Sequence, residues 1–194
     1  MLYSVSKSLV WLYFHAFYKI EITGIGNIPN DGAIICPNHF NIWDPMLVAI
    51  CIPREIKFMA KYEVFRNPIV RFYLNDVGTY PVKRGEVDLA SIKHTLKLLK
   101  QKELVGLFPE GTRMKSGKLG EANSGVAVFA IKSEKAVIPV AITGSYKFFT
   151  KLKITFGQPI DFVQYKKDKM TNDDYNKLSQ IVMENIRQLK KENA

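Results

Sequence analysis

Three short apolar runs, at 33–36, 104–108 and 137–142, constrain the fold of this chain more than any other feature of its sequence. Runs of this length, bounded by turn residues, are typical of strands buried inside a sheet. Segments with helical periodicity separate them, as at 87–101, where apolar residues recur every three or four positions. Strands that alternate with helices predict an α/β fold, a single domain in which helices flank a mixed sheet.

The remaining elements follow from weaker signals. Further strands are predicted at 19–23, 56–60, 79–82 and 152–156, and further helices at 45–50, 67–74, 125–132 and 171–191. Thr171 and Asp174 have the spacing of a capping box at the start of the last helix. No internal repeat, low-complexity tract or linker divides the chain.

The first 18 residues predict an amphipathic helix. One helical face carries Leu2, Val5, Leu9, Leu12, Tyr13 and Ala16, widened by Val10, Phe14 and Phe17. A membrane span needs about 20 mostly apolar residues, and this stretch is shorter and interrupted. It also lacks the charged leader and cleavage site of a secretory signal. It is typical of a helix that lies in a membrane interface, with a surface helix docked on the core as the alternative. We therefore predict a membrane-associating helix at 1–18 and one folded domain at 19–194.

The net charge of +10 predicts a polyanionic partner, either an anionic membrane surface or an acidic substrate. Nucleic acid is disfavoured, because neither zinc-finger spacing nor an RNA-binding motif is present. The two cysteines, Cys36 and Cys51, cannot build a disulfide framework, and the three scattered histidines indicate no metal site. The cysteine usage predicts reduced thiols in a protein that faces the cytosol.

A histidine and an aspartate, His39 and Asp44, lie five positions apart directly after the first buried run. Histidine is the side chain best suited to remove a proton near neutral pH, and a carboxylate on its far nitrogen fixes its tautomer. On a helix the two would lie about 140° apart, so they meet only across a turn. As an alternative, Asp44 only caps the helix that begins at Pro45, and His39 is a core residue. Cys36 is expected to face the core rather than to pair with His39.

A second motif, Phe108-Pro109-Glu110-Gly111-Thr112-Arg113, supplies a candidate anion site. Arg113 offers a fixed fork for a phosphate, and Arg84 a second cation, unless both are solvated surface charges. Gly111 permits close backbone approach, so its N–H is a candidate donor to an oxyanion. Glu110 is expected to orient an arginine or Asn38, or to accept a hydrogen bond from a glycerol.

Four blocks in this order resemble the glycerolipid acyltransferase family, and within it the 1-acylglycerol-3-phosphate acyltransferases. The blocks are Asn38-His39 with Asp44, 78–84, 108–113 and 137–140, and the resemblance spans roughly 19–156. It implies a glycerol-3-phosphate acyltransferase-like fold and acyl transfer from acyl-CoA or acyl-carrier protein to lysophosphatidic acid. It also implies no metal, no cofactor and no covalent acyl-enzyme. In this resemblance His39 and Asp44 are catalytic, and the substrate-binding residues are Asn38, Arg84, Glu110, Gly111, Thr112 and Arg113.

Two alternatives to this function stay open. Within the same class, the acceptor could be glycerol 3-phosphate or another lysophospholipid. From another class, the chain could be a non-catalytic membrane-binding module, although the intact His39 and Asp44 argue against that. The predicted location is the cytoplasmic face of the cell membrane, as a peripheral or monotopic protein.

Overall fold

The computed structural model describes residues 2–83, 88–114 and 119–193. Its centre is a seven-stranded sheet with the order β1-β7-β6-β2-β5-β3-β4. The strands are β1 (Lys19–Thr23), β2 (Ala33–Pro37), β3 (Ile56–Lys61), β4 (Tyr80–Val82), β5 (Leu104–Gly106), β6 (Val137–Gly144) and β7 (Lys151–Phe156). Neighbouring strands are parallel except for the antiparallel pair β6–β7. The mixed sheet predicted from the sequence is confirmed.

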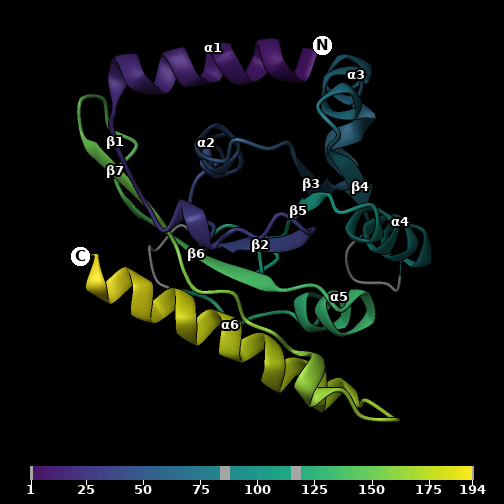
Figure 1. Ribbon diagram of the computed structural model, residues 1–194. Helices are drawn as coiled ribbons and strands as arrows, with labels where there is room; N and C mark the ends of the chain where they lie inside the picture. Colours follow the sequence, from purple (N-terminus) through teal and green to yellow (C-terminus); the bar gives the residue numbers. More distant parts are fainter. Residues whose placement is uncertain (1, 84–87, 115–118, 194) are drawn as a thin grey trace.

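Helices cover both faces of this sheet (Figure 1). They are α1 (Leu2–Phe17), α2 (Asp44–Cys51), α3 (Pro68–Asp76), α4 (Leu89–Lys100), α5 (Gly125–Ser133) and α6 (Asn172–Glu192). The predicted capping box opens α6: the Thr171 hydroxyl accepts from the Asp174 N–H, and the Asp174 carboxylate accepts from the Thr171 N–H. The two layers of helices explain why β2 is a continuous apolar run. Ile35 packs into the core under α1 and α2, whereas Ile34 and Cys36 pack on the side of α5 and α6.

The helix α1 has two apolar faces rather than the single one predicted from its sequence. One face docks on the domain, with Phe14 fully buried and the Lys7 ammonium donating to the carbonyl of Ile52 at the end of α2. The other face points to solvent: Val5, Leu9 and Leu12 are 51%, 63% and 61% exposed. Among the described residues, no helix has both the length and the hydropathy that crossing a bilayer requires.

Candidate active site

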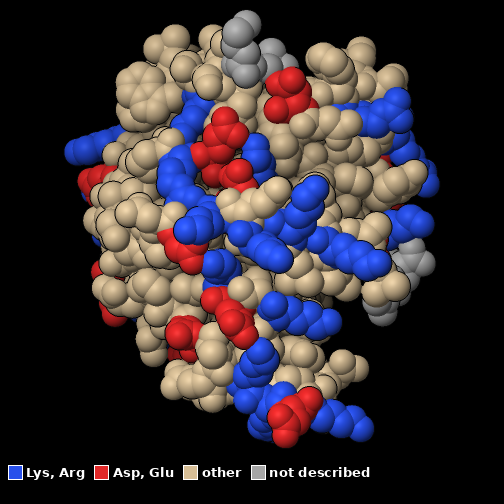
Figure 2. All heavy atoms as spheres, turned by 45° about the vertical axis from the view of Figure 1, so that its right-hand side comes forward, with Lys and Arg blue, Asp and Glu red and all other residues tan. Residues whose placement is uncertain are grey.

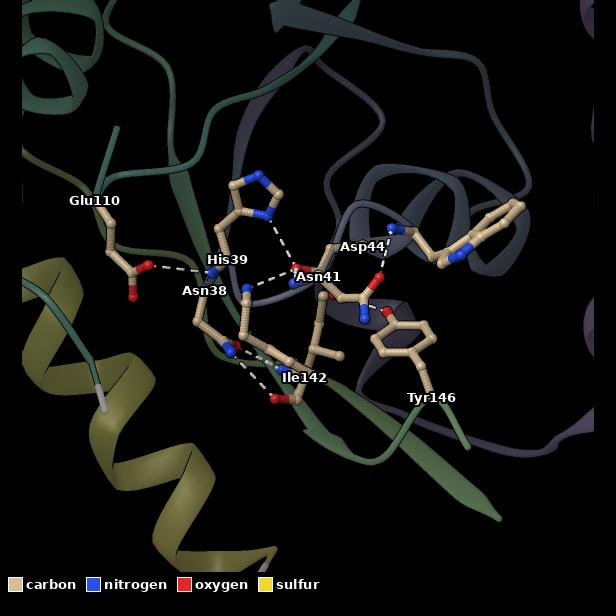
Figure 3. A network of polar contacts seen from close by, with 9 residues as sticks. Asn38, His39, Asn41, Asp44, Glu110, Ile142 and Tyr146 are labelled. Carbon is tan, nitrogen blue, oxygen red and sulfur yellow. Dashed lines mark hydrogen bonds and ion pairs between the residues drawn. The ribbon is translucent and has the colours of Figure 1, made fainter. Parts of the chain in front are cut away.

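The site begins where β2 ends. Asn38 follows β2 and is 2% exposed. Its side chain donates to the carbonyl of Ile142 at 3.1 Å and accepts from the Ile142 N–H at 2.7 Å (Figure 3). These two bonds fasten the chain to β6 immediately before His39. In the structure, both polar ends of the Asn38 amide bind Ile142. The substrate contact that the resemblance implies for Asn38 therefore stays a prediction.

His39 and Asp44 meet across a turn, as their spacing required. Nδ1 of His39 lies 2.9 Å from Oδ2 of Asp44, which is fully buried. The same oxygen accepts the backbone N–H groups of Phe40 and Asn41, each at 2.7 Å. The turn is therefore folded around the carboxylate, and this fixes the side of the imidazole that faces Asp44.

Asp44 does not cap the following helix, contrary to the alternative drawn from the sequence. It is itself the first residue of α2, and the N-cap position falls on Trp43, which makes no side-chain cap bond. The Asp44 carboxylate instead reaches back to the N–H groups of the preceding turn. Pro45, next in the helix, has no N–H for a cap to accept.

Tyr146 completes the surroundings of Asp44, and the sequence reasoning missed it. Its hydroxyl donates to Oδ1 of Asp44 at 2.7 Å. Burial and the neighbouring Asp44 charge raise the pKa of Tyr146 far above its usual value, which keeps the hydroxyl protonated as a donor. One signal was available: Tyr146 lies two residues after the end of β6, and the carboxyl ends of the parallel strands β2 and β6 meet at one edge of the sheet.

The free side of the imidazole faces away from Asp44. The His39 ring stacks on Phe108, with ring centroids 4.0 Å apart and planes inclined by 25°. Figure 3 shows the second ring nitrogen, Nε2, on the opposite side from Asp44. The side chain of His39 is 14% exposed. One nitrogen is therefore held by a buried carboxylate, and the other is left for a reaction partner.

Glu110 contacts His39 through the backbone. Its Oε2 accepts the His39 N–H at 3.3 Å, and the residue is 7% exposed. The expected contact with Asn38 is absent, because the Asn38 amide is bound to Ile142. Oε1 of Glu110 is buried and has no hydrogen-bond partner among the residues that the structure describes. Burial raises the pKa of Glu110 to about 6.

Glu110→Gln is expected to make the stability of the protein less dependent on pH. Because Glu110 binds its proton more tightly in the folded protein than in the unfolded chain, wild-type stability falls as pH rises from about 4.5 to about 6. At about 1.4 kcal/mol per pH unit, the variant gains at most about 2 kcal/mol over wild type at pH 7 and little at pH 4. Urea unfolding at both pH values measures this, with the exposed Glu192→Gln as control. An equal difference at the two pH values would contradict the assignment.

The other residues of the second motif differ in their positions. Gly111 has φ of 66°, and a Cβ there would come within 2.4 Å of the Asn123 amide nitrogen, so only glycine fits. Its N–H donates to the carbonyl of Phe108 at 3.0 Å. The N–H is thus occupied in this conformation, and its use as an oxyanion donor stays a prediction. Thr112 and Arg113 are exposed, and the next residue is tied to the site, because the Met114 N–H donates to the His39 carbonyl at 2.8 Å. Arg84 lies outside the described residues.

Two cavities meet at Phe108. One, of about 180 Å³, is lined mainly by apolar side chains of α1, α2, β3 and α3, including Val10, Ala49 and Leu74. The other, of about 770 Å³, is more polar and is lined by the Glu110–Thr112 segment and the start of α5. Because His39 stacks on Phe108, which lines both cavities, the imidazole lies near the boundary between an apolar and a polar space.

Among the residues that the structure describes, neither a metal site nor a reactive thiol is found around these cavities. Within the described ranges, no group of three or more His, Cys, Asp or Glu side chains could hold a metal ion. Cys36 is fully buried, and burial raises the pKa of its thiol well above the usual range. The expectation that Cys36 faces the core is confirmed, which leaves His39 without a thiol to activate.

The family model of acyltransferases matches residues 19–143. The chain belongs to the acyltransferase family. Relatives named as 1-acyl-sn-glycerol-3-phosphate acyltransferases include one from Bacillus subtilis, 32% identical over 73% of this chain and 73% of its own length. Another, chloroplastic and from Arabidopsis thaliana, is 32% identical over 74% of this chain and 41% of its own. The chain spans less than half the length of the plant relatives it matches.

The fold is also that of a solved structure. The 1-acyl-sn-glycerophosphate acyltransferase of Thermotoga maritima superposes with a TM-score of 0.77 at 23% identity, covering 99% of this chain and 80% of the other. This likeness confirms the predicted α/β fold. The match to the family model includes His39, Asp44 and the 108–113 motif and ends before Tyr146.

Proposed function

We propose that this protein transfers an acyl group from acyl-CoA or acyl-carrier protein to the free hydroxyl of lysophosphatidic acid, which yields phosphatidic acid. The observation that carries the proposal is the His39 imidazole, held on one nitrogen by a buried carboxylate and stacked on Phe108, which lines both an apolar and a polar cavity. The names of the acyltransferase relatives support the acceptor.

In the proposed mechanism, His39 acts as a general base through Nε2. It removes the proton of the acceptor hydroxyl as that oxygen attacks the thioester carbonyl. When the tetrahedral intermediate collapses, the C–S bond breaks and the thiolate takes the proton back from Nε2. Asp44 keeps Nδ1 protonated and stabilises the imidazolium between the two steps. Atoms and charges balance without a cofactor or a metal ion.

The two cavities suit the two halves of the substrates. The apolar one, which extends from Phe108 between α1, α2 and α3, is shaped for a hydrocarbon chain whose carbonyl lies near His39. The polar one begins at Glu110, whose unpartnered Oε1 can accept a hydrogen bond from a glycerol hydroxyl. Arg113 precedes Met114, whose N–H donates to the His39 carbonyl. We propose that Arg113 binds the acceptor phosphate together with Arg84.

Release of free thiol from palmitoyl-CoA or palmitoyl-carrier protein, measured with and without lysophosphatidic acid, tests this function. The proposal predicts thiol release that depends on the acceptor and appearance of phosphatidic acid in equal amount. Glycerol 3-phosphate and lysophosphatidylcholine as alternative acceptors separate the substrate classes. Absence of acceptor-dependent release with every pair of substrates would instead favour a non-catalytic membrane-binding module.

Arg113→Lys is expected to lower kcat/KM for lysophosphatidic acid by about tenfold or more although the charge is kept, because lysine lacks the two-pronged guanidinium. The defect should largely disappear with monoacylglycerol, an acceptor without the phosphate. Arg187→Lys on α6, whose side chain is 43% exposed and pairs with Glu184, is the matched control and should change neither rate. An equal loss with both acceptors would assign Arg113 to the donor or to the fold.

The proposed location is the cytoplasmic face of the cell membrane. The exposed apolar face of α1 (Val5, Leu9 and Leu12) supports it, since an amphipathic helix of this kind partitions into a membrane interface. Figure 2 shows Lys and Arg side chains gathered on the face of the molecule that carries α4, where Lys93, Lys97 and Lys100 are exposed. Positive charge of this density attracts the phosphates of the substrates.

A further inference from the structure

The loop between β6 and β7, residues 145–150, presents two adjacent phenylalanines to solvent. Phe148 is 60% exposed and Phe149 is 81% exposed. Single exposed apolar side chains are common on soluble proteins, but two adjacent ones that are both mostly exposed add little to the core of the fold. Folding of the domain therefore does not explain why these two positions are aromatic.

The backbone conformation at Phe149 also disfavours a large side chain at this position. Its φ is 62°, in the left-handed region, and of the non-glycine residues with positive φ in the described chain it is the only apolar one. Bulky side chains are disfavoured there, whereas glycine and asparagine are tolerated. A residue that is both strained and exposed indicates a role outside the packing of the domain.

Several bonds fix the loop so that it presents these rings. The Thr150 hydroxyl lies 2.6 Å from the carbonyl oxygen of Ser145 and 2.7 Å from that of Lys147, and its single proton is shared between these two acceptors. The Phe149 N–H donates to the carbonyl of Phe17, the last residue of α1, at 2.7 Å. The loop is a defined structure, and it is attached to the C-terminal end of the helix whose outer face is also apolar.

The rings continue the exposed face of α1. Phe17 lies 5.2 Å from Phe148 and 6.1 Å from Phe149, measured between ring centroids. In Figure 1 the loop joining β6 and β7 lies beside the end of α1 that is remote from the N-terminus. Two exposed lysines, Lys147 in the loop and Lys19 after α1, border these rings. Aromatic rings flanked by lysine are typical of segments that lie at the level of lipid headgroups.

We propose that the 145–150 loop is a second membrane anchor, which inserts Phe148 and Phe149 into an anionic bilayer next to α1. The inference rests on the proposed membrane location and adds to it the surface by which the domain itself, and not only its N-terminal helix, contacts lipid. The exposed face of α1 and the 145–150 loop would together fix the orientation of the domain on the bilayer. A single helix would leave the domain free to rotate about it.

Phe149→Asn separates the membrane role from a structural one. Asparagine tolerates positive φ, so the variant is expected to unfold at the same or a higher temperature than wild type. Its affinity for vesicles of phosphatidylcholine and phosphatidylglycerol at 3:1 should fall at least about fivefold, as measured by co-sedimentation, because one inserted ring is lost. Since salt screens charges but not apolar contacts, this ratio should persist at high salt. Leu89→Ser, which removes an apolar side chain 63% exposed on α4, is the matched control and should bind as wild type does.

A fluorescent label reports insertion directly. Both native cysteines are buried, and burial raises the pKa of both thiols, so Phe149→Cys and Leu89→Cys can be labelled selectively with a polarity-sensitive dye. Vesicles should shift the emission to the blue at position 149 and not at position 89.

No shift at position 149 while the protein co-sediments, or equal binding by Phe149→Asn and wild type, overturns the loop anchor alone. A change of oligomeric state in Phe149→Asn without vesicles, with vesicle binding unchanged, assigns the loop to contacts between copies and also overturns it. Wild-type protein that binds no vesicles overturns both the location and the anchor, whereas turnover of detergent-dispersed lysophosphatidic acid tests the proposed reaction separately.

Discussion

His39→Ala is expected to lower acyl transfer by about 10²–10⁴-fold and to leave the protein folded. The rate falls because Nε2, the proposed proton acceptor, is lost. The fold survives because Asp44 keeps three donors without the imidazole: the N–H groups of Phe40 and Asn41, and the hydroxyl of Tyr146. The buried carboxylate therefore stays satisfied, and the cost is confined to the stacking contact with Phe108.

Initial rates of thiol release measure the loss, and urea unfolding measures stability in parallel. His94→Ala is the matched control, since His94 is an exposed histidine on α4 and should retain full activity. Turnover within a factor of a few of wild type by folded His39→Ala protein would remove the general base from the mechanism.

Asp44→Asn is expected to lower the rate by about 10²-fold or more while the turn keeps its shape. Oδ2 receives three donors and Oδ1 receives only the Tyr146 hydroxyl, which can also act as an acceptor. The asparagine oxygen should therefore take the place of Oδ2, with its amino group facing Tyr146. His39 then keeps its tautomer and loses only the negative charge that stabilises its protonated form.

Asp44→Ala separates this electrostatic effect from a structural one. It leaves the N–H groups of Phe40 and Asn41 and the hydroxyl of Tyr146 without an acceptor, and each buried unsatisfied group costs about 1–3 kcal/mol. The free energy of unfolding should drop by several kcal/mol in Asp44→Ala and by much less in Asp44→Asn. Equal stability of the two variants would show that the carboxylate does not hold the turn together.

The elements of the fold could be predicted because their signals are local. Continuous apolar runs marked β2, β5 and β6, and the residues Thr171 and Asp174 marked the start of α6 to the residue. The spacing of His39 and Asp44 showed that a turn was needed for their contact, although it left the capping alternative open, and the structure forms that turn. Elements and contacts that depend on residues close together in the sequence could therefore be predicted.

The errors concern groups whose partners are distant in sequence or compete locally. The Asp44 carboxylate had two sets of N–H groups within reach, and the preceding turn bound it rather than the helix start. The bond from the Gly111 N–H to the carbonyl of Phe108 was also not predicted, because it depends on the conformation of the whole 108–111 turn. Tyr146 reaches Asp44 across 102 positions, so it could be found only from the neighbouring ends of β2 and β6 and not from any local motif.

The parallel pairing of β1 with β7 has a consequence for how the protein is made. Every β1 residue pairs with a β7 residue 132 positions later, from Lys19 with Lys151 to Thr23 with Thr155. During synthesis at about 5–20 residues per second, β1 emerges early and waits several seconds for the strand that holds it. Throughout that interval α1, joined directly to β1, has its apolar residues uncovered before the core can receive Phe14. If α1 partitions into a membrane interface, as proposed, the nascent chain is expected to meet lipid before β1 pairs with β7.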